Sequence, residues 1–451
     1  MSWLAWCRRA WLFSLVWALV ACTGVEGTIT LELVTAPDSE VMDPVVRARL
    51  TLSDPETVVE AERDANGRLS LGIDIEAQGG AGTVSFEGFD AAGDLVAFGR
   101  TPPVPLQSFE GEVTIYVAAP MGMDEAPVPL SPARADFGLA RLTFGAALAG
   151  GRGADGTPSA SFAIYNAYSH DFQVGLDMPT ALADVTAIAG ASNDVYLYGG
   201  VDQIGRESAT AWRFVTSAQP AGQYIDFLPN EDHARTGARA AMVASETAII
   251  TGDPALRMDG IGGTVSPFAS APALTGTATS VIFDTVFRTL FVGAGNGTGG
   301  YVLEADQFIP LDHAGLRRMG HETVVLPDAT ALVLGGQIGS VFSLDGLVVD
   351  MQSREMTEYP GILATGRRDA AIAVTAEHVV AAGGLDEGGA VLGDAEILDA
   401  RTLQPVAIVP MVVPRHGAQA VALGSGQVVI VGGLDNDGRP IPTIEIFTPA
   451  P

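Results

Sequence analysis

The chain has 451 residues, of which 47% are hydrophobic and 17% are charged, a composition typical of a packed globular protein and not of long disorder. All 24 basic residues are arginine, and against 53 acidic residues they leave a net charge of −29. So acidic a chain repels phosphate backbones and anionic lipids, which argues against nucleic-acid binding. The absence of lysine also excludes mechanisms that need a lysine Schiff base or a P-loop lysine.

The N-terminus has the pattern of an export signal. Arg8 and Arg9 precede the apolar run Ala10–Ala21, which is too short to cross a bilayer, since a spanning helix needs roughly 20 residues. A basic start followed by a short apolar core predicts a secretory signal peptide over residues 1–21. The run ends in Leu19-Val20-Ala21-Cys22, which resembles the bacterial lipobox. The alternative is an ordinary signal peptide that is cleaved nearby.

The resemblance to the lipobox implies that Cys22 is acylated and that residues 22–27 form a lipidated tether. Acyl chains would hold the protein on a membrane by hydrophobic transfer, without a spanning helix. Thr23 follows the cysteine, and a residue other than aspartate at this position resembles the signal for outer-membrane sorting. The sequence does not decide on which side of that membrane the protein lies. Cys7 lies in the signal peptide, so the folded part is expected to have neither a disulfide nor a thiol nucleophile.

Residues 28–119 show the two-residue alternation of apolar and polar side chains that strands with one buried face require. The alternation is clear at Ile29, Leu31 and Leu33, and Asp64-Ala65-Asn66-Gly67 between two such runs is a hairpin signal. Six or seven short strands predict an immunoglobulin-like β-sandwich that serves as a spacer or accessory binding module. The proline-rich segment Met121–Pro132 breaks the alternation, so a second domain is placed at residues 120–451.

The second domain contains a strand end with glycine that recurs at steps of 41 to 53 residues. For an all-β chain this period predicts the blades of a β-propeller. Seven such ends favour seven blades, with six as the alternative. We expect Val128–Leu130 to supply the fourth strand of the last blade and so close the ring. The glycine landmarks are Gly150-Gly151, Gly199-Gly200, Gly252, Gly293-Gly295, Gly335-Gly336, Gly383-Gly384 and Gly432-Gly433.

The order of features within each unit resembles the kelch repeat: an arginine at the start, an apolar strand, a glycine pair, a third strand with an acidic turn, and a closing strand. The units around Gly252 and Gly293 depart from this pattern. We expect the recurrent arginine to join neighbouring blades through carboxylates or carbonyls, and the alternative is a ligand role in the channel. The candidate arginines are Arg134, Arg235 or Arg239, Arg318, Arg368 and Arg415.

The remaining candidate groups lie near the unit starts and the glycine pairs. No two of the six histidines are at metal-ligand spacing, but His233, His321 and His416 fall near arginines at unit starts and could converge on one face. Acidic loops with Asp386, Asp435 and Asp437 follow the last two glycine pairs, and they could hold Ca²⁺ or simply form turns. The candidate ligand or partner residues are therefore Arg318, Arg368, Arg415, His321, His416, Asp386, Asp435 and Asp437.

These patterns contain no catalytic motif, no cofactor fingerprint and no assigned metal site. They favour a non-catalytic, lipid-anchored protein of the cell envelope that presents propeller loops to a protein or glycan partner. One alternative is a carbohydrate-active enzyme, similar to sugar isomerases with kelch-like propellers, with its site at the channel mouth. Another is a purely structural envelope component. A catalytic site would need histidine, arginine and acidic groups converging in one pocket.

Overall fold

The computed structural model describes residues 26–54, 56–64, 74–76, 81–105, 111–218, 222–227, 233–283, 286–294 and 299–451. The expected signal peptide and Cys22 lie outside the described residues, as does most of the expected turn at residues 64–67. Strands make up almost all regular structure in the described part, with η2 (Ala314–Leu316) as a short 3-10 helix. The all-β class is therefore confirmed. Among the described residues we find no helical segment with the length and hydropathy of a membrane span.

The N-terminal domain is built from two sheets that share one core. Alternate residues of β2 are buried, because one face of its sheet packs inward. Leu50, Phe86 and Ile115 belong to this core, and Leu31 packs against it. The first sheet has the order β3(Glu56–Glu62)-β2(Arg47–Ser53)-β6(Val84–Phe89)-β7(Leu95–Arg100), the second has the order β4(Asp74–Glu76)-β1(Glu26–Val34)-β9(Gly111–Tyr116), and β5(Ala81–Gly82) pairs with β8(Val104–Pro105). We call this domain the sandwich.

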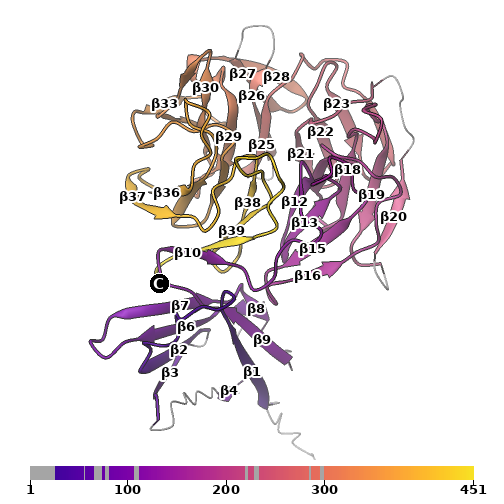
Figure 1. Cartoon of the computed structure of the whole chain (residues 1–451). Helices are drawn as coiled ribbons and strands as arrows, with labels where there is room; N and C mark the ends of the chain where they lie inside the picture. The colour runs from indigo at the N-terminus through magenta and orange to yellow at the C-terminus, as the bar shows by residue number, and fades with distance from the viewer. Residues whose placement is uncertain are drawn as a thin grey trace, which may run out of the picture.

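The C-terminal domain is a propeller in which antiparallel sheets follow one another along the chain and each first strand contacts the next. Figure 1 shows the sheets arranged in a ring above the sandwich. We number them as blades 1–7 in chain order. Blade 1 is β12(Gly138–Leu142)-β13(Gly145–Ala149)-β15(Phe162–Asn166)-β16(Asp171–Val174), blade 2 is β17(Thr186–Ala189)-β18(Val195–Tyr198)-β19(Ala211–Val215)-β20(Gln223–Asp226), and blade 3 is β21(Ala240–Ala244)-β22(Thr247–Ile250)-β23(Leu256–Asp259)-β24(Thr264–Pro267). Blade 4 is β25(Thr277–Phe283)-β26(Val286–Ala294)-β27(Gly299–Glu304)-β28(Gln307–Asp312), and blade 5 is β29(Met319–Val325)-β30(Ala331–Ile338)-β32(Gly346–Val349)-β33(Met356–Tyr359), with β31(Val341–Phe342) paired to β30. Blade 6 is β34(Ala371–Val374)-β35(His378–Ala382)-β36(Asp394–Asp399)-β37(Pro405–Pro410), and blade 7 is β38(Gln419–Ala422)-β39(Val428–Val431)-β40(Glu445–Thr448)-β10(Gly122–Glu125).

The last blade is completed by the N-terminal part of the same domain. The strand that does this is β10, which pairs antiparallel with β40. The expectation that Val128–Leu130 forms this strand was wrong. That segment follows β10 in the chain, and its Leu130 amide donates to the Pro442 carbonyl at 2.7 Å. The Gln419 side chain then donates to the Phe137 carbonyl at 2.7 Å and joins blade 7 to blade 1.

The sandwich contacts one face of the propeller. Arg100 donates to the Ser425 carbonyl at 2.9 Å, and Tyr168 donates to the Pro103 carbonyl at 3.0 Å. Both propeller residues lie in turns, Ser425 between a first and second strand and Tyr168 between a third and fourth strand. The loops between second and third strands, and the connections between blades, therefore lie on the opposite face. We call that opposite face the free face.

The recurrent glycines mark the point where each second strand ends on the free face. The Gly384 amide donates to the Arg415 carbonyl of the next blade at 2.8 Å, and the amides of Gly151, Gly200 and Gly336 make the equivalent bond to the blade that follows theirs. At Gly383 φ is +61°, and a Cβ there would lie 2.3 Å from the Arg415 carbonyl oxygen. Glycine is needed because the backbone is left-handed and the next blade comes so close.

The substitution Gly383→Ala is expected to lower the free energy of unfolding by about 2–4 kcal/mol, because it adds a steric clash to the strain of a left-handed alanine. Gly389→Ala is the matched control, since its φ is +80° but nothing lies within 4 Å of an added Cβ. The control should cost only about 1 kcal/mol. Urea unfolding of both variants measures the difference, and equal losses would contradict the crowding argument.

Candidate binding face at the mouth of the central channel

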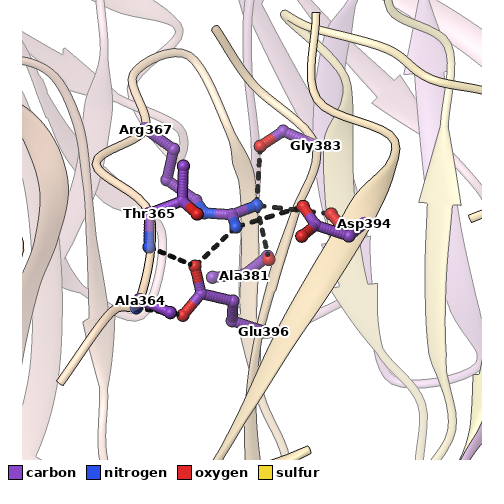
Figure 2. A network of polar contacts seen from close by, with 7 residues as sticks. All are labelled: Ala364, Thr365, Arg367, Ala381, Gly383, Asp394 and Glu396. Atoms are coloured by element: carbon purple, nitrogen blue, oxygen red, sulfur yellow. Dashed lines mark hydrogen bonds and ion pairs between the residues drawn. The ribbon is translucent and has the colours of Figure 1, made fainter. Parts of the chain in front are cut away.

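The recurrent arginine lies in a joint between blades, and blade 6 shows its full form (Figure 2). Arg367 is fully buried and donates to the carbonyls of Ala381, Gly383 and Asp394 at 3.0–3.3 Å. It also pairs with the Glu396 carboxylate at 2.6 Å. The guanidinium thus binds its own blade, whereas its backbone carbonyl accepts the Gly336 amide of the blade before.

Blade 7 repeats this arrangement at Arg415. Its guanidinium donates to the carbonyls of Gly432 and Thr443, at 3.0 and 2.8 Å, and pairs with Glu445 at 2.5 Å. Glu445 also accepts the amides of Val412 and Val413. Burial lowers the pKa of Arg415, and the charge of Glu445 opposes that effect. Arg415 is therefore a structural residue with no surface for a ligand.

The joints of blades 1, 3 and 5 lack the carboxylate. Arg235 and Arg318 donate to backbone carbonyls instead, with distances down to 2.8 and 2.7 Å. Burial lowers the pKa of Arg134 to about 10. The third-strand positions that correspond to Glu396 and Glu445 are occupied by Ala163, Leu256 and Leu347, as the strand registers show.

The expectation that Arg368 holds the repeat position was wrong, because the buried joint residue is its neighbour Arg367. Arg368 is partly exposed, and its guanidinium lies 3.8 Å from the Asp369 carboxylate. The sequence contains both arginines side by side, and only the registers of the neighbouring strands decide which one faces the joint.

Two residues after the joint position the backbone is left-handed in six blades, and these residues line the mouth of the channel on the free face. The Asp184 amide donates to the Asp136 carbonyl at 2.7 Å and the Asp369 amide to the Gly320 carbonyl at 2.8 Å. Where such a bond forms, the amide of the residue donates to a carbonyl of the preceding blade. We call this set the mouth ring: Asp136, Asp184, Gly237, Gly320, Asp369 and Gly417.

Charged side chains surround the mouth ring in pairs of opposite sign. Arg152 lies between Asp136 and Asp184, at 3.7 and 3.6 Å. Burial and the charge of Asp136 raise the pKa of Asp184, and Arg152 opposes this shift. Arg239 of blade 3 pairs with Glu322 of blade 5 at 3.5 Å and so passes over the start of blade 4. The mouth therefore carries a mixed set of charges that largely neutralise one another.

His321 lies in the wall of the channel and not on an open surface. It is almost fully buried, and its Nε2 is 2.7 Å from the Thr277 hydroxyl, which also contacts the Thr323 hydroxyl at 2.7 Å. Burial, followed by the charge of Arg318, lowers the pKa of His321 to about 4. At neutral pH the ring is therefore neutral and serves as a hydrogen-bonding group between blades 4 and 5.

The other histidines lie in separate places. His416 is on the free face, where its backbone bridges to Leu434. His170 is buried between the sandwich and blade 1, with Nδ1 2.9 Å from the Tyr165 hydroxyl, and burial lowers its pKa to about 4. His313 caps η2 and His378 begins β35 at the opposite end of its blade. His233, His321 and His416 stand at the starts of blades 3, 5 and 7 on the free face, and His321 is buried between two blades.

The acidic loops are turns. Asp435 accepts the amides of Asp437 and Arg439 at 2.8 and 2.9 Å, and these bonds lower its pKa. Asp386 accepts the Ala390 amide in the same way, and Asp437 pairs with Arg439 at 2.7 Å. Within the described ranges no group of three or more histidine, cysteine or acidic side chains is arranged to hold a metal. Asp386 and Asp435, which were expected to hold Ca²⁺ or to form turns, thus accept amides of their own loops, whereas Asp437 binds a side chain.

Sequence reasoning missed the aspartates of the mouth ring. A signal for them was present, because Asp136 and Asp369 each stand two residues after the joint arginine, where other units have glycine. Aspartate is among the few residues other than glycine that tolerate a left-handed backbone. An alignment of the units by their joint position would have shown it.

Comparison with known proteins adds little to this geometry. No protein-family model matches the chain, and no curated protein matches its sequence. Among solved structures, that of YjhT is similar, with 9% sequence identity, coverage of 70% of this chain and 95% of YjhT, and a TM-score of 0.47. The propeller assignment therefore depends on the strand order of the chain itself.

Removal of the buried carboxylate from a joint is expected to be costly. Glu445→Gln leaves the buried Arg415 charge uncompensated and should lower the free energy of unfolding by about 3–5 kcal/mol. Asp437→Asn breaks an exposed ion pair and should leave stability unchanged within error, because such pairs contribute little. Urea unfolding at neutral pH tests both, and a Glu445 variant as stable as the native protein would rule out the joint as a stabilising element.

Stability is expected to fall as the pH drops from about 6.5. His170 and His321 have lowered pKa values when folded, so the unfolded chain takes up their protons first, and stability is complete only above the unfolded pKa of about 6.5. Between pH 6.5 and 5 each histidine should account for a loss of roughly 2 kcal/mol. Urea unfolding across this range should show that the free energy of unfolding depends less on pH in the double variant His170→Gln/His321→Gln than in the native protein. An unchanged slope in that variant would contradict the assignment.

Proposed function

We propose that the protein is a non-catalytic binding protein of the cell envelope, anchored by lipid at Cys22, which presents the free face of its propeller to a protein or glycan partner. The observation that carries this proposal is the contact of the sandwich with the opposite face, through Arg100 and Tyr168. That contact leaves the loops between second and third strands uncovered. Loops held on a rigid scaffold are the usual place for binding residues.

The position of the sandwich also supports the anchored arrangement. The first strand, β1, begins at Glu26, only a few residues after Cys22. With lipid at Cys22 the sandwich would rest at the membrane surface, and the free face of the propeller would be directed away from it. A partner in the surrounding compartment could then reach the mouth ring and the loops around it.

The charge pattern at the mouth supports recognition over catalysis. Arg152 and Arg239 are paired with carboxylates, and His321 on the first strand of blade 5 is buried and neutral. An acid–base site would need an accessible group with a pKa near the working pH. The carbohydrate-enzyme alternative therefore has no geometric support among the described residues.

The lipid anchor is tested by Cys22→Ser. We expect this variant to move from the membrane fraction to the soluble fraction of the cells, because the acyl chain can no longer be attached. Cys7→Ser is the matched control and should remain in the membrane fraction, since Cys7 lies in the predicted signal peptide. Membrane association of the Cys22 variant equal to that of the control would refute the anchor.

The binding face is tested by capture of partners from detergent-solubilised envelope extract with the whole protein as bait. Arg152→Ala/Arg368→Ala removes two cations from the free face and should weaken capture of a specific partner about tenfold or more. Arg257→Ala is the control, because this exposed arginine pairs with Asp306, which lies in a turn on the face that contacts the sandwich. If both variants retained the partner equally, the free face would not be the binding surface.

A further inference from the structure

A cavity lies on the face of the propeller that contacts the sandwich. The turns between first and second strands of blades 7, 1 and 2 meet around it, and its volume is about 360 Å³. Gly424, Thr143 and Asn193 represent these three turns in the lining. Gly424 also lies against the sandwich, since a Cβ added to it would be 3.1 Å from Pro103. The cavity is thus at the junction of the two domains, where small-molecule sites are often found.

The rim of this junction cavity is held in one shape by bonds between blades. The Thr143 amide donates to the Asn193 side chain at 2.9 Å, and the Asn193 side chain donates to the Thr143 hydroxyl at 2.9 Å. The Ala191 amide donates to the Ser245 carbonyl of blade 3 at 3.0 Å. Blades 1, 2 and 3 are therefore joined at the rim, and a preformed cavity loses little conformational freedom when it binds a ligand.

Arg141 is the one charged residue among the described residues that line the junction cavity. It stands on the first strand of blade 1, between Ala140 and Leu142, which are buried in the core shared with blade 2. Because side chains alternate along a strand, Arg141 is exposed on the opposite side. Within the described ranges no ion pair joins Arg141 to a carboxylate.

The charge of Arg141 is uncompensated in the cavity. Surrounding protein lowers the pKa of its guanidinium, and no neighbouring carboxylate opposes that effect. Glu246 lies beside Gly190 at the blade 3 side of the rim. Its oxygens are already bound, since they accept the Ser192 amide at 3.1 Å and the Tyr196 hydroxyl. A guanidinium that is open to a cavity but crowded by protein gains from pairing with an anion.

We propose that the junction cavity binds a small organic monoanion, a carboxylate with an apolar body, whose carboxylate pairs with Arg141. The planar guanidinium matches a carboxylate through two parallel N–H groups. Leu142, Ala189 and Leu423 offer apolar lining to the rest of the ligand. The net charge of −29 disfavours a dianion such as phosphate more than a monoanion. This site lies on the face opposite the free face, so the inference goes beyond the proposed partner binding.

Calorimetric titration of the full-length protein with hexanoate tests the site, and hexanamide is the uncharged analogue of similar shape. We expect hexanoate to bind saturably and hexanamide to bind about tenfold or more weakly, because the amide carries no charge to pair with the guanidinium. Arg141→Gln should weaken hexanoate binding about tenfold or more and should bind the two compounds alike.

The matched control is Arg401→Gln. Arg401 is exposed in the turn between β36 and β37, on the same face as the junction cavity but outside its lining. The control removes the same charge, so hexanoate affinity should stay within about twofold of the native value if only long-range charge is altered.

A second variant, Ala191→Phe, keeps Arg141 and adds bulk to the lining from an exposed turn position. It should weaken the binding of both compounds, because it reduces the space for the apolar body. All three variants alter exposed side chains, so an unchanged melting temperature confirms that each is folded.

Three results would overturn the inference. The first is hexanoate that does not bind the native protein, or binds no better than hexanamide. The second is hexanoate binding that Arg141→Gln retains in full. The third is inorganic phosphate that binds more tightly than hexanoate and depends on Arg141, which would make the site one for a dianion.

Discussion

The crowding of the first strands around one channel is the constraint on which this structure depends. Each second strand must end where the backbone of the next blade lies within a few ångströms, and the close approach at Gly383 and the Arg415 carbonyl shows how little room remains. The joint arginine satisfies the carbonyls that this crowding leaves facing inward. Burial of its charge is costly, and in blades 6 and 7 the carboxylates of Glu396 and Glu445 offset that cost.

The joints are not uniform around the ring, and their chemistry follows from the residue at the third-strand position. Blades 1, 3 and 5 have an arginine whose bonds go to carbonyls. In blade 2 the joint carbonyl belongs to Leu182, and Trp212 stands at the third-strand position. The apolar joint of blade 2 thus stands between the arginine joints of blades 1 and 3, whereas blades 5, 6 and 7 have arginine joints in succession. The ion pair from Arg239 to Glu322 spans the start of blade 4, where the repeat pattern is weakest.

Much of the fold could be predicted from the sequence, because glycine at a crowded strand end and aspartate in a tight turn are local requirements. Asp435 is such a case, since its turn bonds are all to residues within four positions. The choice of Arg367 over Arg368, and of β10 over Val128–Leu130, depends on registers between distant strands. The mouth ring was missed for the same reason, since its bonds join different blades.

The closure of blade 7 by β10 also orders the assembly of the molecule in time. Blades 1–6 each consist of strands that are near neighbours in the chain, so they can form as the chain emerges. The pairing of Gly122–Glu125 with Glu445–Thr448 joins segments more than 300 residues apart, and contacts of such sequence separation form slowly. Until β40 has been made, β10 has no strand with which to pair, and the mouth ring is open. A surface that requires the closed ring can therefore engage a partner only after the whole propeller has been made.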